Sequence, residues 1–454
     1  MLRRSLSPRA KGILPPFPLT PKPYTGPSYD TVLRDRTDYV NPAIFKHFKE
    51  PLMIVEGKMQ YMFDHQGKRY LDCFGGIVTV SVGHCHPRVT KVIQEQADTL
   101  VHSTTLYLNP NLTSFAKELA STLPGDPKEW QIYFTSSGSE ANDLACLMAR
   151  TYTKRTTMVS LRNGYHGMSE GTRNLTAVRK WNHATMRPAG YVKTLCPDEF
   201  RAGVSKEQAV RDLKEVIDME VGDQNVAGFI AERYQGVGGA VALADGYLKE
   251  AYAVVRASGG VCISDEVQCG FGRLGTHFWG FEEQGVVPDI ISMAKSIGNG
   301  IPLAAVAAKR DIAHSIKDVL HFNTYGGNPL SMAVGREVLK IIKEDKLQAH
   351  CDEIGNKTLI PGLRKLQEKY PLIGEVRGKG LMIGVDFVTD RATKSPATEA
   401  CNDMHNRLKT EWNIIMGKGG AWGNVFRIKP PMCITHADVE YLLEAMDAVL
   451  AAQR

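Results

Sequence analysis

The chain has 454 residues, 43% of them hydrophobic, and carries a formal net charge of +6 at pH 7. This length exceeds what one hydrophobic core normally serves, so we expect two domains. Five basic residues lie among the first 29 residues, which hold no acid; the rest of the chain is nearly neutral, and we expect no nucleic-acid partner. No apolar run reaches the ~18 residues of a membrane span, so we expect no membrane partner either.

The N-terminus, residues 1–25, is predicted to be a mitochondrial presequence or a disordered tail. It contains Arg3, Arg4, Arg9 and serines but no acid, which is the composition of a transit peptide. Pro8 and the proline-rich run after it limit any amphipathic helix, which keeps the disordered tail as the alternative. We favour targeting, which predicts that the protein works in the mitochondrial matrix.

Residues 26–80 are predicted to pack with the smaller of the two domains. The stretch YMFDHQGKRYLD (61–72) has the pattern of a β-hairpin but no obvious place in the large sheet predicted below. Shortly after it, His84-Cys85-His86 lies in a turn with no second cluster of ligands, so we expect no metal site. The nine cysteines are scattered without a C-x-x-C pair, which indicates reduced thiols.

Residues 81–335 are predicted to form a large α/β domain with a mostly parallel sheet. Short apolar runs alternate there with helical patterns such as the one over 138–148, and this alternation is typical of such a domain. The predicted strands are 131–135, 157–161, 226–231, 261–264, 289–293 and 303–307.

Residues 336–454 are predicted to form a smaller α+β domain. The evidence is a change of pattern: a helix over 333–343, a strand over 381–387 and a helix over 437–452.

Polar residues end three of the predicted strands of the large domain, and ligands in such folds bind beyond the carboxyl ends of strands. The sequence TSSGS (135–139) opens a helix, where it is either an anion site or a simple N-cap. Asp265 ends a second strand, and Lys295 follows a third. Together they suggest pyridoxal phosphate: lysine for the covalent link, carboxylate for the pyridinium nitrogen and the helix start for the phosphate.

The stretch SDEVQCGFGRLG (264–275) also contains a G-x-G-x-x-G pattern, which raises the alternative of a nicotinamide or flavin nucleotide. Four residues separate the strand from the first glycine, and the sequence THFWGF after the last glycine is not a helix start. Both features disfavour a dinucleotide site.

The chain resembles the class III aminotransferases of fold type I, a group that includes ornithine and 4-aminobutyrate aminotransferases. The resemblance runs from about residue 30 to the end. It is carried by SGSEAND (137–143), NGYHG (163–167), SDEVQCGFGRLG (264–275), AKSIGNG (294–300), NTYGGNP (323–329) and RGKGLMIG (377–384). It implies a pyridoxal-phosphate enzyme with a large and a small domain, and a homodimer or higher homo-oligomer with active sites at the interface.

The resemblance also implies roles for individual residues. Lys295 and Asp265 are the expected catalytic residues: Lys295 bonds to the cofactor and moves the proton, and Asp265 pairs with the pyridinium nitrogen. Cofactor contacts are expected from Ser137, Gly138, Ser139, Tyr165, Glu232, Val267, Gln268 and, across the dimer, Thr324. Arg427 is expected to grip the substrate carboxylate, and Ile77 to line the substrate site.

Two positions bear on the substrate. Val237 stands where ornithine and 4-aminobutyrate aminotransferases carry a glutamate that neutralises the carboxylate-binding arginine, and Ile77 replaces a tyrosine of ornithine aminotransferase. The chain most closely resembles the mitochondrial alanine–glyoxylate branch. That branch implies ping-pong transfer of an amino group from alanine, 3-aminoisobutyrate or related amino acids to the oxo acids glyoxylate or pyruvate.

Three alternatives remain at this point. One is a lyase acting on phosphoethanolamine on the same scaffold, and another is a different class III ω-aminotransferase. A non-catalytic binding protein is disfavoured because both Lys295 and Asp265 are present. One departure from the family is Arg233, in place of the usual proline, which is expected to add a charge near the cofactor pocket.

Overall fold

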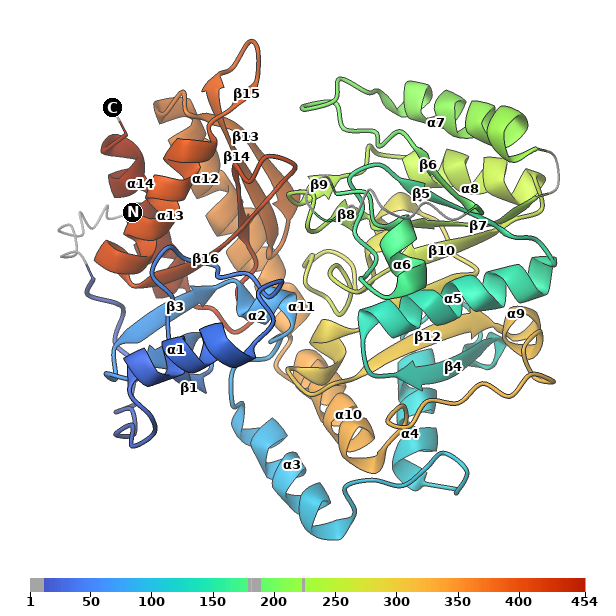
Figure 1. Cartoon of the computed structure of the whole chain (residues 1–454), viewed down its shortest axis with the longest axis horizontal. Helices are drawn as coiled ribbons and strands as arrows, with labels where there is room; N and C mark the ends of the chain where they lie inside the picture. Colours follow the sequence, from blue (N-terminus) through green and yellow to red (C-terminus); the bar gives the residue numbers. More distant parts are fainter. Residues whose placement is uncertain (1–11, 179–180, 182–188, 223–224, 454) are drawn as a thin grey trace.

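The computed structural model of the chain describes residues 12–178, 181, 189–222 and 225–453. Two sheets organise these residues, one on each side of the molecule, with the longest helices packed around them (Figure 1). Of the predicted presequence, residues 1–25, the first 11 residues lie outside the described part. Within the described part, no helix is long and apolar enough to cross a membrane.

The larger part of the chain is built on a seven-stranded sheet of order β4-β12-β11-β10-β7-β5-β6. Its strands are β4 (Trp130–Thr135), β5 (Thr157–Leu161), β6 (Tyr191–Thr194), β7 (Val226–Ala231), β10 (Val261–Asp265), β11 (Ile290–Met293) and β12 (Ala304–Lys309). All six predicted strands are confirmed, whereas β6 at the edge was not predicted.

The pairing in this sheet is parallel except at one strand. β10 runs parallel to β7 and β11, and β5 runs parallel to β6 and β7. β12 is antiparallel to both β11 and β4. Every residue of β5, β7, β10 and β11 is buried, as expected for strands covered by helices on both faces. The prediction of a mostly parallel α/β sheet is confirmed.

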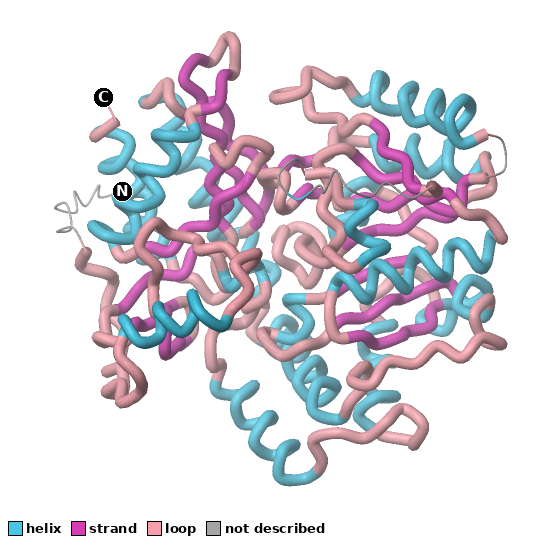
Figure 2. Tube along the Cα trace, viewed as in Figure 1, coloured by secondary structure: helices cyan, strands magenta, loops and turns pink. Residues whose placement is uncertain are grey.

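A second, eight-stranded sheet combines the N-terminal hairpin with the C-terminal part of the chain (Figure 2). Its strands are β1 (Ile54–Lys58), β2 (Tyr61–Asp64), β3 (Arg69–Cys73), β13 (Ile373–Lys379), β14 (Met382–Asp390), β15 (Ser395–Pro396), β16 (Ile414–Gly419) and β17 (Val425–Ile428). The predicted hairpin is β2–β3, and it joins this sheet through the parallel pairing of β3 with β16. The domain boundaries at residues 25, 80 and 335 stay a prediction.

Helices cover both sheets and connect them. The predicted helices over 138–148, 333–343 and 437–452 are α5 (Gly138–Thr153), α10 (Pro329–Glu344) and α14 (His436–Ala451). The other α-helices are α1 (Tyr29–Tyr39), α2 (Gly75–Val78), α3 (Pro87–Thr99), α4 (Pro110–Ala120), α6 (Glu170–Leu175), α7 (Lys206–Glu215), α8 (Tyr247–Ala257), α9 (Arg310–His314), α11 (Leu347–Cys351), α12 (Ile360–Lys369) and α13 (Thr398–Trp412).

Shorter elements complete the fold. They are the 3-10 helices η1 (Pro127–Glu129), η4 (Gly280–Gln284) and η5 (Lys295–Gly298), the π-helices η3 (Val216–Val221) and η6 (Asp352–Leu359), and a two-stranded ribbon of β8 (Tyr234–Gln235) and β9 (Val241–Ala242).

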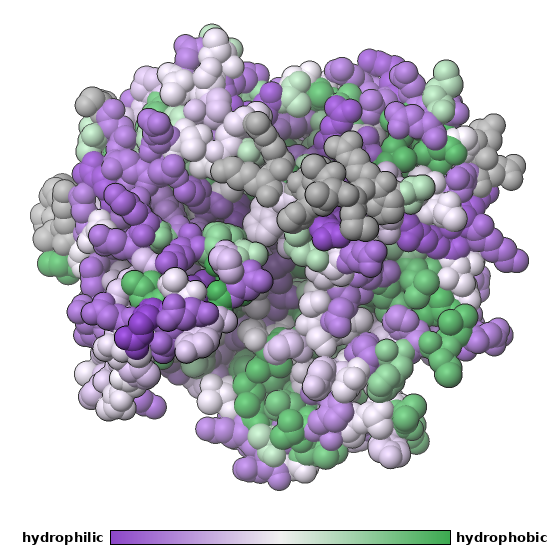
Figure 3. Space-filling view, viewed as in Figure 1, coloured by the Kyte–Doolittle hydropathy of each residue, from purple (hydrophilic) through white to green (hydrophobic). Residues whose placement is uncertain are grey.

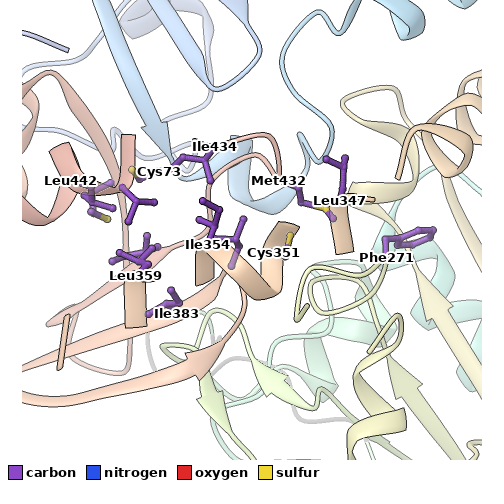
Figure 4. Packing of buried hydrophobic residues seen from close by; sticks show 14 of the residues in the cluster. Cys73, Phe271, Leu347, Cys351, Ile354, Leu359, Ile383, Met432, Ile434 and Leu442 are labelled. Carbon is purple, nitrogen blue, oxygen red and sulfur yellow. The ribbon is translucent and has the colours of Figure 1, made fainter. Parts of the chain in front are cut away.

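One apolar core joins the two sheets. It reaches from Phe271, in the loop after β10, through Leu347 and Ile354 to Ile383 in the second sheet and Leu442 on α14 (Figure 4). All of these side chains are at most 7% exposed. The shared core packs the two sheets against each other beside the carboxyl ends of the strands of the first sheet.

Candidate active site

A cavity of about 320 Å³ lies at the carboxyl ends of β4, β10 and β11. Because parallel strands present these ends at one edge of a sheet, residues distant in sequence meet there. Nine of the predicted site residues line the cavity: Ser137, Gly138, Ser139, Tyr165, Glu232, Asp265, Val267, Gln268 and Lys295. Thr324, Ile77 and Arg427 are not among the lining residues.

The start of α5 forms one wall. The Ser137 hydroxyl accepts from the Glu140 N–H at 3.3 Å, so it caps the helix, and the Ser139 hydroxyl accepts from the Met168 N–H at 3.2 Å. The first N–H groups of a helix have no partner within it, and they concentrate positive charge. A Cβ on Gly138 would lie 3.0 Å from Cγ1 of Val267, so the backbone closely approaches the opposite wall. The geometry suits a phosphate held by backbone N–H groups.

Asp265 is held rigidly on the cavity floor. Its Oδ2 accepts hydrogen bonds from Nδ2 of Asn142 and Nδ1 of His166, both at 2.8 Å, and its Oδ1 accepts from the Val267 N–H at 3.1 Å. Only 2% of the Asp265 side chain is exposed. The carboxylate therefore has one fixed orientation, which suits recognition of a protonated ring nitrogen.

Asn142 and His166 are functional residues that sequence reasoning missed. Both stand inside motifs that were recognised, SGSEAND and NGYHG, and both are at most 2% exposed. The available signal was a polar side chain on the apolar face of α5, beside Ala141 and Ala145, because a buried amide requires a hydrogen-bond partner.

Lys295 follows β11 and begins η5 with a φ of 51°, a left-handed conformation that a residue with a side chain rarely adopts. It is partly exposed to the cavity. Desolvation by the surrounding protein lowers the pKa of the Lys295 amine, and the carboxylates of Asp265 and Glu232 oppose this shift only in part. An amine with a lowered pKa is a better nucleophile and proton acceptor near neutral pH.

Glu232 directly follows β7 and is a second buried acid, only 3% exposed. Its two carboxylate oxygens accept from the backbone N–H groups of Tyr165 at 3.0 Å and Gly236 at 2.8 Å. Burial and the charge of Asp265 raise the pKa of Glu232. Glu232 thus fixes the loop that carries Tyr165 and the loop after β7 against each other.

Arg233, which was expected to add a charge near the cofactor pocket, directly follows the lining residue Glu232 and is paired with two acids. Its guanidinium Nε donates to Glu283 at 3.0 Å, and Nη2 donates to Asp245 at 3.2 Å. Arg233 is 2% exposed and does not line the cavity. The charge is neutralised by Glu283 of η4, which also accepts hydrogen bonds from Tyr234 and Lys379.

Gln268 and Arg427 lie at the end of the cavity nearest the second sheet. Gln268 lines the cavity, and its Oε1 accepts from Nζ of Lys429 at 3.1 Å. Arg427 lies behind it, 6% exposed, and donates to the carbonyls of Lys418 at 3.2 Å and Gly236 at 3.3 Å. Burial lowers the pKa of Arg427 to about 10, which still leaves it cationic at neutral pH.

Like Arg427, the predicted residues Thr324 and Ile77 do not line this cavity. Thr324 is exposed in the loop before α10. Ile77, in α2, is 43% exposed and has a φ of 62°. The roles of Thr324 and Ile77 stay predictions.

The His84-Cys85-His86 stretch is a separate case. His84 bonds to Asp72 at 2.8 Å, and no group of three metal-ligating side chains occurs in the described part of the chain.

The residues present fit pyridoxal phosphate. A fixed carboxylate, a lysine of lowered pKa and the start of a helix surround one cavity, and these supply a partner for the ring nitrogen, for the aldehyde and for the phosphate. The cavity wall lacks the helix start after Gly275 that a dinucleotide fingerprint needs, because residues 276–279 form no helix.

Comparison with known proteins agrees with this chemistry. The family model described as aminotransferase class-III matches residues 44–450. The chain is 47% identical to alanine–glyoxylate aminotransferase 2 homolog 2, mitochondrial, of Arabidopsis thaliana, covering 96% of this chain and 90% of that protein. It is 41% identical to the human alanine–glyoxylate aminotransferase 2, mitochondrial, covering 98% of this chain and 91% of that protein.

Solved structures give the same result. An (S)-enantioselective ω-transaminase from Thermomicrobium roseum superposes with a TM-score of 0.86 at 31% identity, covering 94% of this chain and 99% of that chain. A phospholyase from Arthrobacter in complex with phosphoethanolamine also superposes with a TM-score of 0.86, at 29% identity, covering 93% of this chain and 99% of that chain.

Proposed function

Because this chain belongs to the class III aminotransferases and is a pyridoxal-phosphate enzyme of fold type I, we propose that it transfers an amino group from alanine or a related amino acid, such as 3-aminoisobutyrate, to glyoxylate or pyruvate. The two relatives named above, both called alanine–glyoxylate aminotransferase 2, support this choice of substrates. The structural observation that carries the proposal is Lys295 in the same cavity as the immobilised Asp265.

We propose that Lys295 and Asp265 are the catalytic residues. When bound, pyridoxal phosphate supplies an electron sink that stabilises negative charge on the substrate carbon. Asp265, oriented by His166 and Asn142, holds the proton on the ring nitrogen. Lys295 would hold the cofactor by condensing with its aldehyde, with loss of water, and once displaced by the substrate its free amine would accept the proton from the substrate carbon and deliver it to C4′ of the cofactor. Its lowered pKa leaves a larger share of the amine unprotonated.

The other walls bind and orient the cofactor. The N–H groups of Gly138 and Ser139, at the helix start capped by Ser137, are proposed to hold the phosphate. Val267 and Tyr165 are proposed to cover the two faces of the ring, and Gln268 to donate to the phenolic oxygen. Glu232 acts through the backbone of Tyr165, which it holds at 3.0 Å.

Arg427 is proposed to bind the substrate carboxylate as a planar fork. Val237 supplies no carboxylate to neutralise it, and no ion pair of Arg427 occurs among the described residues. Its two carbonyl partners leave donors free on the guanidinium. Arg427 is therefore available for a substrate carboxylate in both halves of a ping-pong cycle. Ile77 disfavours ornithine as a substrate, because it has no hydroxyl that could bind an ω-amine.

We propose that the protein is a homodimer or higher homo-oligomer. Apolar side chains gather on the lower part of one face, where α3, α10 and the loop after α3 lie (Figure 3). That loop is joined to the one before α10, because the His102 and Tyr325 rings lie 5.9 Å apart. Large apolar residues of both loops are exposed, namely Val101, Leu106, Tyr107, Leu108, Val319, Leu320, Phe322 and Tyr325. A second copy would cover them and receive Thr324 at its phosphate site.

The site of action is proposed to be the mitochondrial matrix. The basic, acid-free N-terminus supports import, and both named relatives are described as mitochondrial. Fusion of residues 1–30 to a fluorescent protein should direct it to mitochondria. A diffuse signal throughout the cell would contradict the proposal.

A half-reaction screen tests the substrates. The purified protein, loaded with pyridoxal phosphate, is mixed with single amino acids while the visible absorbance of the cofactor is recorded. Alanine and 3-aminoisobutyrate should change the absorbance, glyoxylate should restore it, and ornithine should have no effect. Reaction with ornithine instead would indicate a different ω-aminotransferase. Release of inorganic phosphate from phosphoethanolamine would indicate the lyase alternative. The structural similarity to the Arthrobacter phospholyase is the reason to test this reaction.

A further inference from the structure

Lys429 is a fully buried lysine at the edge of the active site. It follows β17 directly and has no exposed surface. Its Nζ donates to two oxygens, the carbonyl of Gly236 and Oε1 of Gln268, each at 3.1 Å. Lysine is almost never fully buried unless it is paired, and neither of these partners is an acid. The burial therefore needs an explanation other than an ion pair.

The bond from Lys429 determines which way the Gln268 amide faces. A glutamine amide has an oxygen that accepts and a nitrogen that donates, and only its partners distinguish the two. Nζ of Lys429 donates to Oε1, so Oε1 is the atom that faces Lys429. Burial and the nearby Arg427 lower the pKa of Lys429, but even a neutral amine keeps two N–H donors, enough for both oxygens. The polar atom left for the cavity is Nε2.

Gly236 completes the support for this amide. A Cβ added to Gly236 would lie 2.2 Å from Oε1 and 2.5 Å from Nε2 of Gln268, so a larger residue there would force the amide to shift. The Gly236 N–H donates to Glu232 at 2.8 Å, and its carbonyl accepts from Lys429. The glycine, the lysine and the amide thus form one packed unit, in which the bond from Lys429 sets the orientation of the amide.

We infer that Lys429 is a positioning residue: it holds Oε1 of Gln268 so that the amide NH₂ group donates a hydrogen bond into the cavity. The acceptor is the phenolic oxygen of pyridoxal phosphate, so the inference rests on the proposed function. Lys429 acts through Gln268 and touches neither substrate nor cofactor. Without it, the amide can present its oxygen instead, which would repel a phenolic oxygen.

A double-mutant cycle in cofactor affinity tests this coupling. Cofactor-free wild type, Lys429→Met, Gln268→Ala and the double variant are titrated with pyridoxal phosphate, and Kd is read from the visible absorbance. Each single variant should bind about tenfold more weakly. The double variant should bind no more weakly than Gln268→Ala, because Lys429 acts only through Gln268. Independent losses that multiply in the double variant would overturn the inference.

Lys409→Met is the matched control. Lys409 is also buried, 7% exposed, and donates to the carbonyl of Glu50 at 3.0 Å, away from the cavity. Its variant should leave the Kd of pyridoxal phosphate unchanged. A loss equal to that of Lys429→Met would show that removal of any buried lysine loosens the site, and would overturn the inference.

Gln268→Glu tests the orientation with Lys429 intact, so the inference remains testable if Lys429→Met does not fold. The carboxylate keeps an oxygen toward Lys429 and replaces only the donor that faces the cavity. We expect Kd to rise about tenfold or more, the visible absorption band of the bound cofactor to shift, and the thermal midpoint of the cofactor-free protein to stay at or above that of the wild type. A spectrum and Kd like those of the wild type would overturn the inference. A wild-type protein that binds no pyridoxal phosphate would instead refute the proposed function.

Discussion

The cavity and the apolar core that joins the two sheets lie side by side but have opposite chemistry. The cavity wall encloses Asp265, Glu232 and Lys295, whose charges are held by fixed hydrogen bonds or altered in pKa. The core, from Phe271 to Leu442, is built from packed apolar side chains (Figure 4). The buried charges of the cavity lower the stability of the fold but orient the reacting groups. The packed core provides the stability that offsets this cost.

The largest expected effect is a loss of turnover, without a loss of thermal stability, when Lys295 in the cavity is replaced. Lys295→Ala should lower turnover by on the order of 10⁴-fold, because the covalent and the proton-transfer roles are lost together. The thermal midpoint of the cofactor-free protein should not fall, because removing the amine also removes the cost of its desolvation. Steady-state kinetics and thermal unfolding check both points. Lys249→Ala, at an exposed position on α8, is the control, and equal turnover in the two variants would refute the assignment.

A substitution in the core should instead lower stability and leave turnover nearly unchanged. Ile383 of β14 is fully buried in the shared core, so Ile383→Ala should cost about 3 kcal/mol of the free energy of unfolding through lost burial and a residual cavity. Turnover per folded molecule should stay close to that of the wild type. Chemical denaturation and active-site titration with pyridoxal phosphate measure the two quantities. Met219→Ala, at a side chain 81% exposed, should change stability by less than about 0.5 kcal/mol.

A third effect lies at the border of the two regions. Arg427→Leu should raise the KM for alanine about 100-fold, because a charge-assisted pair with the substrate carboxylate is lost. The Kd of pyridoxal phosphate should stay unchanged. Arg427→Lys should recover only part of the affinity, since an ammonium cannot form the planar fork. An unchanged KM with a lowered kcat would show that Arg427 does not hold the carboxylate.

The sequence was sufficient to predict which strand ends carry the polar groups. Asp265 and Lys295 follow short apolar runs directly, and parallel strands present such ends at one edge, so their proximity follows from topology alone. The antiparallel direction of β12 could not be predicted, because its continuous apolar run is the same whichever way the strand runs beside its neighbours. Hairpin β2–β3 was recognised, but its partner β16 lies over 300 residues along the chain.

Side-chain partners were the part that the sequence could not show. The bonds from Asn142 to Asp265 and from Lys429 to Gln268 span 123 and 161 residues. No local pattern records such a pairing; only the folded backbone brings the two atoms within reach. The pairing of Arg233 was not predicted for the same reason, because its partner Glu283 lies 50 residues away in η4.

The smallest expected effect is a pH dependence that the cavity should show and the core should not. The pKa of Lys295 lies below its usual value because desolvation outweighs the opposing charges of Asp265 and Glu232. Only the unprotonated amine can bond to pyridoxal phosphate, so uptake of the cofactor should accelerate as the pH rises and level off below pH 10.5, the value of an unshifted lysine. Stopped-flow absorbance of the cofactor-free protein measures this profile. Ile383→Ala should give the same inflection as the wild type, because the core carries no charge that acts on Lys295. An inflection at or above that of free lysine would show that the carboxylates dominate, and would remove the electrostatic distinction between the cavity and the core.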